Sequence, residues 1–424
     1  MACGGARGLR VFRALILIAC SLTVASPAAP QNALPVTCAD ESGPDQKDKK
    51  SAGKDKSKKG GDGVQLELAG ACATLSGKVL AVHQNQLATS GMSVPTLIGR
   101  LDSPSQPRTV NTLTASANLD ITRTTAIGDL ETSLNFQWLK TSDDEGKFGA
   151  FSVQELYGSL AGWTVGYTDS LMNFWSGDFQ FTAAAPKRTV GIVSFERDIT
   201  DDWKLAVAIE SGLPSSRQNT EGIRSVDFSS PLLTARWLYE KDDWSFHLSG
   251  LVRRAEFSTD SRFPLLSIAA TTRTGWAASV GATIPAKLAG EDDEISLQAT
   301  YASDASPFLG TAVDLSALAN VVPTTGPTQG WSAVASFHHV FSDHWEANAF
   351  ASFLTLTGEV GAARPSLETR RIGLNVYWLP VDSLKFGAEI GVVDTALSAN
   401  GSLGLFRGNG GKALVGYLSA EWKF

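Results

Sequence analysis

The stretch "ALVGYLSAEWKF" (Ala413–Phe424) decides the fold of this chain, because every second residue in it is apolar. Its apolar row is Leu414, Gly416, Leu418, Ala420, Trp422 and Phe424. The other row turns polar toward its end. An alternation with a period of two predicts a β-strand with one apolar and one polar face. Because the last residues of a soluble chain are usually frayed and polar, the apolar row must contact something other than water.

The same alternation recurs along the chain from Ala73 onward. It predicts sixteen strands, at residues 73–85, 109–123, 127–141, 150–160, 162–169, 187–197, 202–211, 231–240, 243–257, 273–286, 293–303, 328–341, 344–358, 366–379, 382–396 and 411–424. Most of them are about twice as long as the usual globular strand. That length suits a tilted strand that crosses a bilayer.

Short and long connections alternate between these strands. Short turns are expected at about residues 124–126, 161, 198–201, 241–242, 287–292, 342–343 and 380–381, with mostly longer loops between the other pairs. Short turns on one side and longer loops on the other are typical of an outer-membrane barrel with its turns in the periplasm. Pairing the first strand with the last leaves no free edge. We therefore predict an all-β fold, a 16-stranded antiparallel transmembrane β-barrel.

Three very short polar turns each stand directly before a tryptophan. They read "TDDW" (Thr200–Trp203), "KDDW" (Lys241–Trp244) and "SDHW" (Ser342–Trp345), and "AGW" (Ala161–Trp163) is a weaker relative. Because the indole ring is amphipathic, tryptophan at this position favours an aromatic girdle at a membrane interface. Hairpins of a soluble β-sandwich are the alternative, and the repeated pattern argues against them.

The first residues have the form of a secretory signal, assigned to residues 1–28. A basic stretch with Arg7, Arg10 and Arg13 precedes a short apolar run, and Ser26–Ala28 offers a cleavage site. An alternative is a lipoprotein signal, because Leu17–Cys20 resembles a lipoprotein box. The mature chain contains no apolar run long enough for a transmembrane helix, so we expect an exported protein of the bacterial outer membrane.

Residues 29–72 are expected to form a periplasmic segment before the barrel of residues 73–424. Cys38 and Cys72 are an even pair in an oxidising compartment, which predicts a disulfide, although two free thiols are the alternative. Between them, residues 45–61 contain seven Lys and three Asp and almost nothing apolar, so this insert is predicted to be disordered. The full chain carries a net charge of −7, and nucleic-acid binding has no support.

A barrel of this size leaves an aqueous lumen, lined by the polar row of each strand. Charges of both signs on that row indicate a wet interior, although each one alone could be a solvated charge without a function. On parity, the lumen-lining candidates are Asp120, Glu131, Lys204, Glu210, Arg236, Arg253, Arg371, Lys385 and Glu389.

The third long loop, residues 170–186, reads "SLMNFWSGDFQFTAAAP". A solvent-exposed loop would not carry Phe174, Trp175, Phe179 and Phe181 unless it packed against something. We therefore expect this loop to fold into the lumen and narrow it.

Three segments resemble the alphaproteobacterial general porins of the Rhizobiales type. They are "QELYGSLAGWTVGYTDSLMNFWSGDF" (Gln154–Phe179), "RIGLNVYWLPVDSLKFGAEIGV" (Arg371–Val392) and "CATLSGKVLAVH" (Cys72–His83). The resemblance implies a trimeric 16-stranded barrel that passes small hydrophilic solutes, with the third loop at its constriction. It also implies that Cys72 pairs with an earlier cysteine. The lysine-rich insert departs from this family.

Carried over residue by residue, the resemblance implies an acidic side of the constriction at Asp169 and Asp178. The candidates for the basic side are Lys187, Arg188, Arg253 and Arg371. It further implies that the strand end with Trp422 and Phe424 is the signal read by the barrel assembly machinery.

The sequence thus predicts a porin for passive diffusion of small hydrophilic solutes and ions, with no cofactor and no metal. The excess of acidic over basic residues favours a channel with a weak preference for cations. A substrate-selective channel for a sugar or an anion is one alternative. Another is an envelope anchor whose lysine-rich segment contacts peptidoglycan. We expect no enzyme, because no G-x-S-x-G motif is present and the neighbouring His338 and His339 point to opposite faces of one strand.

Overall fold

In the computed structural model, the described residues are 63–68, 70–91, 109–142, 148–181, 183–211, 220–221, 224–227, 230–259, 271–286, 290, 292–310, 328–358, 364–400 and 410–424. The predicted signal, the lysine-rich insert, Cys20 and Cys38 lie outside these ranges. Among the described residues, no helix has the length and hydropathy to span a membrane.

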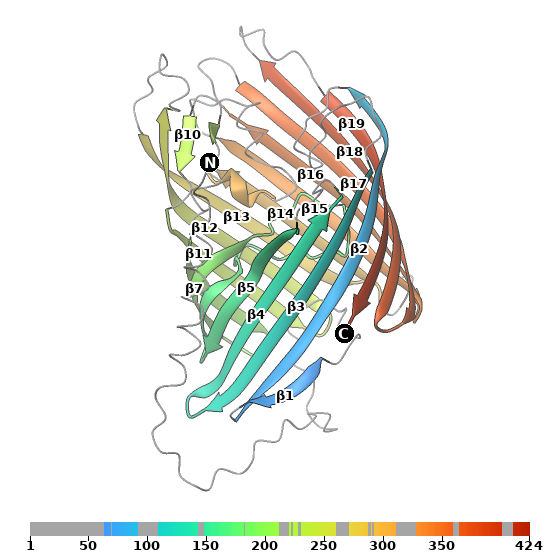
Figure 1. The fold of residues 1–424 in the computed structure, drawn as a ribbon. Helices are drawn as coiled ribbons and strands as arrows, with labels where there is room; N and C mark the ends of the chain where they lie inside the picture. Colours follow the sequence, from blue (N-terminus) through green and yellow to red (C-terminus); the bar gives the residue numbers. More distant parts are fainter. Residues whose placement is uncertain are drawn as a thin grey trace, which may run out of the picture.

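Sixteen strands form a closed ring (Figure 1). They are β2 (Ala71–Gly91), β3 (Thr109–Thr125), β4 (Gly128–Thr141), β5 (Ala150–Leu160), β6 (Trp163–Asp169), β7 (Thr189–Asp198), β8 (Trp203–Glu210), β11 (Leu232–Lys241), β12 (Trp244–Thr259), β13 (Thr271–Pro285), β14 (Glu294–Ser303), β15 (Gln329–Ser342), β16 (Trp345–Thr357), β17 (Arg364–Val381), β18 (Leu384–Asn400) and β19 (Gly410–Lys423). Each pairs antiparallel with its neighbour. The pairs β8–β11 and β19–β2 complete the ring. The predicted 16-stranded antiparallel barrel is confirmed.

Among the described residues, three short strands accompany this ring, and one short helix follows β14. They are β1 (Val64–Leu68), β9 (Thr220–Glu221) and β10 (Arg224–Asp227), and the helix is the 3-10 helix η2 (Ser306–Phe308). The predicted strand bounds agree with those of the ring within a few residues, except that β2 and β18 run longer at the loop end. Extra length beyond the bilayer needs no lipid-facing row, so the apolar alternation stops before the strand does.

Alternate side chains of each strand face opposite sides of the wall, as β17 shows. Arg371 and Tyr377 are buried, whereas Ile372 and Leu374 between them are 53% and 52% exposed. Large exposed apolar side chains in a continuous row would be unstable in water and match the hydrocarbon of a bilayer. We call the row of Arg371 and Tyr377 the inner row, and the row of Ile372 and Leu374 the outer row.

Aromatic rings gather on the outer row at both ends of the wall. At the short-turn end, Trp203 and Trp345 begin β8 and β16, and the ring of Trp345 stacks 6.3 Å from that of Trp378. At the loop end, the ring of Trp276 lies 5.2 Å from that of Tyr301. Two such bands are the expected girdles at the two interfaces of a membrane.

The ring closes at a seam between β19 and β2. Phe424 and Gly77 exchange two backbone hydrogen bonds, of 2.8 and 2.9 Å. Next to this point, β1 pairs with the first residues of β2, from Val64 opposite Leu75 to Leu68 opposite Ala71. Because β3 pairs with the other edge of this part of β2, β1 continues the edge that β19 leaves. Cys72, in the same part of β2, is disulfide-bonded.

Candidate functional site

The segment between β6 and β7, Ser170–Arg188, is the feature that shapes the interior. Its described residues form no helix or strand, yet Met172, Phe181 and Ala184 are at most 2% exposed. The backbone N–H and C=O groups of a buried irregular segment need hydrogen-bond partners, because neither water nor a neighbouring strand pairs with them. Two glutamates and several hydroxyl and amide side chains supply them.

Glu210, on β8, binds the beginning of the segment. One carboxylate oxygen accepts a hydrogen bond of 2.9 Å from the backbone N–H of Leu171, and the other accepts one of 2.8 Å from the hydroxyl of Ser170. Glu210 is 1% exposed. Hydrogen bonds to an ionised acceptor are stronger than neutral ones, so this carboxylate fixes the start of the segment.

Glu389, on β18, binds the segment further along. Its two oxygens accept hydrogen bonds from the backbone N–H groups of Gln180 and Phe181, at 2.8 and 2.6 Å. β8 and β18 stand eight positions apart in the ring in either direction, one way being β8–β11–β12–β13–β14–β15–β16–β17–β18. A segment that contacts both strands on their inner rows therefore crosses the interior of the barrel.

Between these two glutamates the segment contacts the wall formed by β14 and β15. The backbone N–H of Trp175 donates to the side chain of Gln298 at 2.9 Å, and its indole N–H donates to the hydroxyl of Ser336 at 2.8 Å. Further on, the N–H of Ala184 donates to Ser352 on β16 at 3.1 Å. The segment thus covers one side of the inner wall.

Aromatic rings fill the space between the segment and β16. The ring of Phe179 meets that of Phe350 edge-on at 4.6 Å, and the ring of Trp175 lies 6.2 Å from Phe350. The ring centre of Phe181 lies 6.3 Å from that of Tyr417 on β19. This apolar packing explains why a loop of this barrel is rich in Phe and Trp.

Asp178 and Lys385 form an ion pair where the segment meets β18. The Lys385 ammonium also lies 2.6 Å from the Glu346 carboxylate and 3.9 Å above the ring of Tyr377. The hydroxyl of Tyr377 donates to the backbone oxygen of Asp178 at 2.9 Å. Asp178 is therefore balanced by a lysine on the adjacent wall, a pairing that the sequence analysis did not predict.

Arg253 and Arg371, two of the predicted basic residues, lie on the inner row but are only 3% and 2% exposed. The Arg371 guanidinium lies 5.2 Å above the ring of Phe181, so the segment covers it. Both side chains are thus almost fully buried on the inner row, and their place on the basic side of the constriction stays a prediction. Strand parity identifies the row of a side chain but contains no information about what packs over that row.

The other basic candidates belong to the segment itself. Arg188 is held by its neighbours: its side chain donates to the backbone oxygen of Pro307, and its N–H donates to Asn173 at 2.9 Å. Lys187 is exposed and acts electrostatically on Asp169. Asp169 ends β6 on the row of the outward-facing Tyr167, and its carboxylate is hydrogen-bonded to Asn173. Asp169 thus lies at the start of the segment, next to Asn173 and Lys187.

Two further ion pairs lie on the inner row near the short turns. Lys204 is 2.6 Å from Glu240, and Arg236 is 2.6 Å from Glu196. Lys204 and Arg236 were predicted to line the lumen, and their acidic partners were not. The pairings β8–β11 and β7–β8 bring Lys204 near Glu240 and Arg236 near Glu196, and a sequence without known register gives no signal for them.

The inner rows of β3, β4 and β5 form the remaining wall and are mostly half-exposed. Asp120, Glu131 and Glu155 lie here, and all three act electrostatically on Tyr157. Their hydrogen bonds come from neutral groups: Ser159 donates to Glu131 at 3.5 Å. Glu155 was missed by the sequence analysis, because a bulge in the β4–β5 pairing shifts the alternation beside it.

The two neighbouring histidines of β15 face opposite sides of the strand, as predicted. His338 contacts Asn348 at 2.7 Å on the inner row, whereas His339 contacts Asp293 at 2.8 Å. Within the described ranges, no three His, Cys, Asp or Glu residues are arranged to hold a metal ion.

A family model described as "DcaP outer membrane protein" matches residues 76–309 of the 424 in the chain. Among solved structures, the outer membrane channel DcaP of Acinetobacter baumannii matches with a TM-score of 0.65 and 16% identity, over 86% of this chain and 100% of that one. OmpT of Vibrio cholerae in its trimer form matches with a TM-score of 0.51 and 11% identity, over 84% and 99%. No curated protein matches the chain.

Proposed function

The chain belongs to the DcaP outer membrane protein family, and from this premise we propose that it forms a water-filled channel for passive diffusion of small hydrophilic solutes and ions. It is a protein of the bacterial outer membrane. One observation carries the proposal: the segment Ser170–Arg188 crosses the interior between Glu210 and Glu389 and leaves the half-exposed wall of β3–β5 opposite it. The A. baumannii relative is itself described as an outer membrane channel.

The channel passes between the segment and the wall of β3–β5. Its narrowest part is lined by the segment, with Asp178 and Lys187 on the segment side, and it sets the size limit for solutes. Opposed charges at such a constriction orient dipolar solutes and bias ion flow. Asp120, Glu131 and Glu155 are on the opposite wall, and the arginines Arg253 and Arg371 are almost fully buried, which favours a weak preference for cations.

Planar-bilayer recording tests the channel. The purified protein should give discrete ohmic steps, and a salt gradient should give a reversal potential on the cation side. Complete absence of steps from folded protein would contradict the channel. Block of the current by a sugar or an organic anion would favour a substrate-selective channel instead.

We also propose a homotrimer, inserted by the barrel assembly machinery into outer-membrane lipid. Support comes from the likeness to a barrel described in a trimer form. The trimer should withstand SDS until it is boiled, and a monomeric band at every temperature would contradict it. The closer relationship to the alphaproteobacterial general porins stays a prediction based on the resembling segments.

The lysine-rich segment before the barrel is proposed to be a solvated spacer, with peptidoglycan contact as the alternative. Deleting residues 45–60 and measuring co-sedimentation with cell-wall material separates the two. Transport through the barrel involves no chemical step, so we propose no enzymatic activity and no cofactor.

A further inference from the structure

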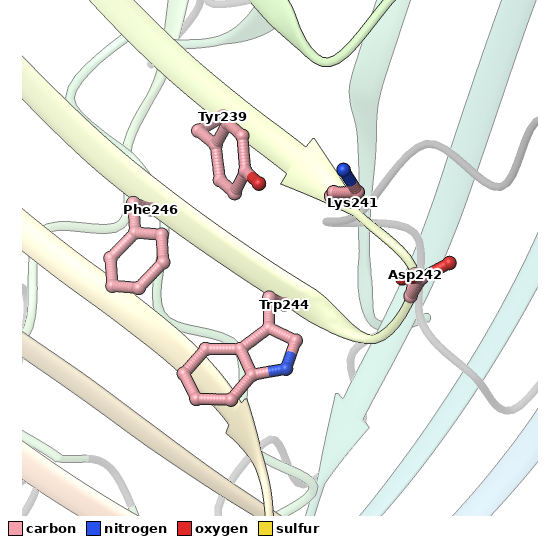
Figure 2. A pocket seen from close by; sticks show the side chains of 5 residues that line it. All are labelled: Tyr239, Lys241, Asp242, Trp244 and Phe246. Carbon is pink, nitrogen blue, oxygen red and sulfur yellow. The ribbon is translucent and has the colours of Figure 1, made fainter.

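A hollow of about 360 Å³ lies on the outside of the barrel where β11 turns into β12. It is lined by Tyr239, Lys241, Asp242, Trp244 and Phe246 (Figure 2). Tyr239 pairs with Phe246 and Lys241 pairs with Trp244 across the two strands, so these four side chains share the outer row. The hollow therefore opens toward the membrane and not toward the channel.

The lining is polar at one end and apolar at the other. Figure 2 shows the hydroxyl of Tyr239 and the indole nitrogen of Trp244 on the side of Lys241 and Asp242, with Phe246 on the opposite side. Trp244 and Phe246 are each 42% exposed. The turn is at the membrane surface and the strands run into the bilayer. The polar end of the hollow therefore lies at the level of lipid head groups, and its apolar end lies at the level of acyl chains.

Both signs of charge are present at the polar end. The Lys241 side chain is 56% exposed, and its ammonium lies 3.7 Å from the carboxylate of Asp202 on the neighbouring turn. Asp242 lies in the turn itself, with a positive φ of 51°. A ligand with a phosphate alone would meet Lys241 but would also face two carboxylates. A ligand with a phosphate and a nearby ammonium satisfies both.

We infer that this hollow binds one phospholipid whose head group carries a primary ammonium beside its phosphate, as in phosphatidylethanolamine. The phosphate contacts Lys241, the ammonium contacts Asp242 and Asp202, and the glycerol region lies against Tyr239 and Trp244. One acyl chain follows the ring of Phe246. This inference depends on the outer-membrane location and does not depend on the channel function.

Native mass spectrometry of the detergent-solubilised protein tests the inference. The protein is incubated with equal amounts of phosphatidylethanolamine and phosphatidylglycerol, and bound lipid is counted per subunit. We expect phosphatidylethanolamine to be retained in preference. Lys241→Gln should lower its bound fraction roughly two- to fivefold, the range for an exposed ion pair. Asp242→Asn should reduce the preference for phosphatidylethanolamine over phosphatidylglycerol.

Lys412→Gln is the matched control, because Lys412 is a 67% exposed lysine with an aspartate partner at 3.3 Å, and it lies at the loop end of β19. It should leave lipid retention unchanged. Equal retention of both lipids by the unaltered protein would overturn the inference, as would unchanged retention in Lys241→Gln. A Lys241→Gln protein that changes its subunit number but not its lipid content would show that a second copy of the chain covers the hollow. Single-channel conductance should be the same in all variants.

Discussion

Glu210 and Glu389 stand on opposite sides of the barrel and bind the same segment of chain from both ends. Each carboxylate uses both of its oxygens, on Ser170 and Leu171 at one end and on Gln180 and Phe181 at the other. These two groups were predicted to line the lumen as solvated charges. They instead determine where the segment lies, and so how much of the cross-section stays open.

Replacing Glu389 with Gln should loosen the segment. The amide offers one acceptor oxygen in place of two and places an NH₂ group against a backbone N–H, so hydrogen bonds worth about 1.5–3 kcal/mol each are weakened or lost. We expect a larger mean conductance and more current noise in planar-bilayer recordings. Glu368→Gln is the control, since Glu368 is a partly exposed carboxylate on the outer row of β17. Identical traces for Glu389→Gln and the unaltered protein would show that the glutamate does not hold the segment.

Replacing Lys385 with Gln should make the channel more cation-selective. The ammonium now balances Asp178 and Glu346, and its removal leaves both carboxylates uncompensated at the edge of the segment. The reversal potential in a salt gradient should move toward the potassium equilibrium value. Lys412→Gln removes a lysine at the loop end and should leave it unchanged. A shift toward anions in Lys385→Gln would contradict this account of the constriction.

Neutralising Asp120, Glu131 and Glu155 together should remove most of the cation preference. These carboxylates lie on the inner rows of β3–β5, and they have no basic partner among their described hydrogen bonds. The same reversal-potential measurement checks this. A triple change to Asn of Asp129, Asp201 and Asp343, which lie in or next to short turns, is the control for total charge. If both triple variants behave alike, selectivity follows net charge and not the wall of β3–β5.

Deleting Phe424 should impair assembly far more than conductance. The deletion removes two backbone hydrogen bonds with Gly77 and a ring that lies against Gly77, within 2.6 Å of where a Cβ would stand. The measured quantity is the yield of heat-modifiable barrel in the outer membrane, and the few channels that do insert should have normal conductance. Phe341→Ala, at a 63% exposed outer-row position, is the control. Normal yields without Phe424 would refute the assembly role.

The strands could be predicted from sequence because each residue of a membrane wall meets either hydrocarbon or water. Trp203, Lys204 and Leu205 already show the alternation of outer and inner side chains in β8, and the same logic applied along the chain gives the sixteen strands of the ring. The packing of the third loop against other residues was predictable from its Phe and Trp side chains, which water would not tolerate. These are local signals, and neither needs knowledge of a distant contact.

The details of the interior could not be predicted in this way. Parity identified Arg371 as an inner-row residue but could not show that Phe181 covers it. The ion pair of Asp178 with Lys385 joins positions far apart in sequence. Such contacts depend on where an irregular segment lies across the lumen, and that is determined by the sum of many hydrogen bonds and ring contacts.

The seam between β2 and β19 also affects how the chain behaves before the barrel has folded. It brings Lys78 within 3.2 Å of Glu421, 343 positions later in the chain. Contacts between such distant residues form slowly, because the chain entropy of closing a very long loop must be overcome first. Until the last strand has been exported, the first strand keeps an unpaired edge beside an apolar row. An unfolded chain of this kind aggregates readily, so we expect its passage across the periplasm to depend on a chaperone that binds extended, alternating apolar segments.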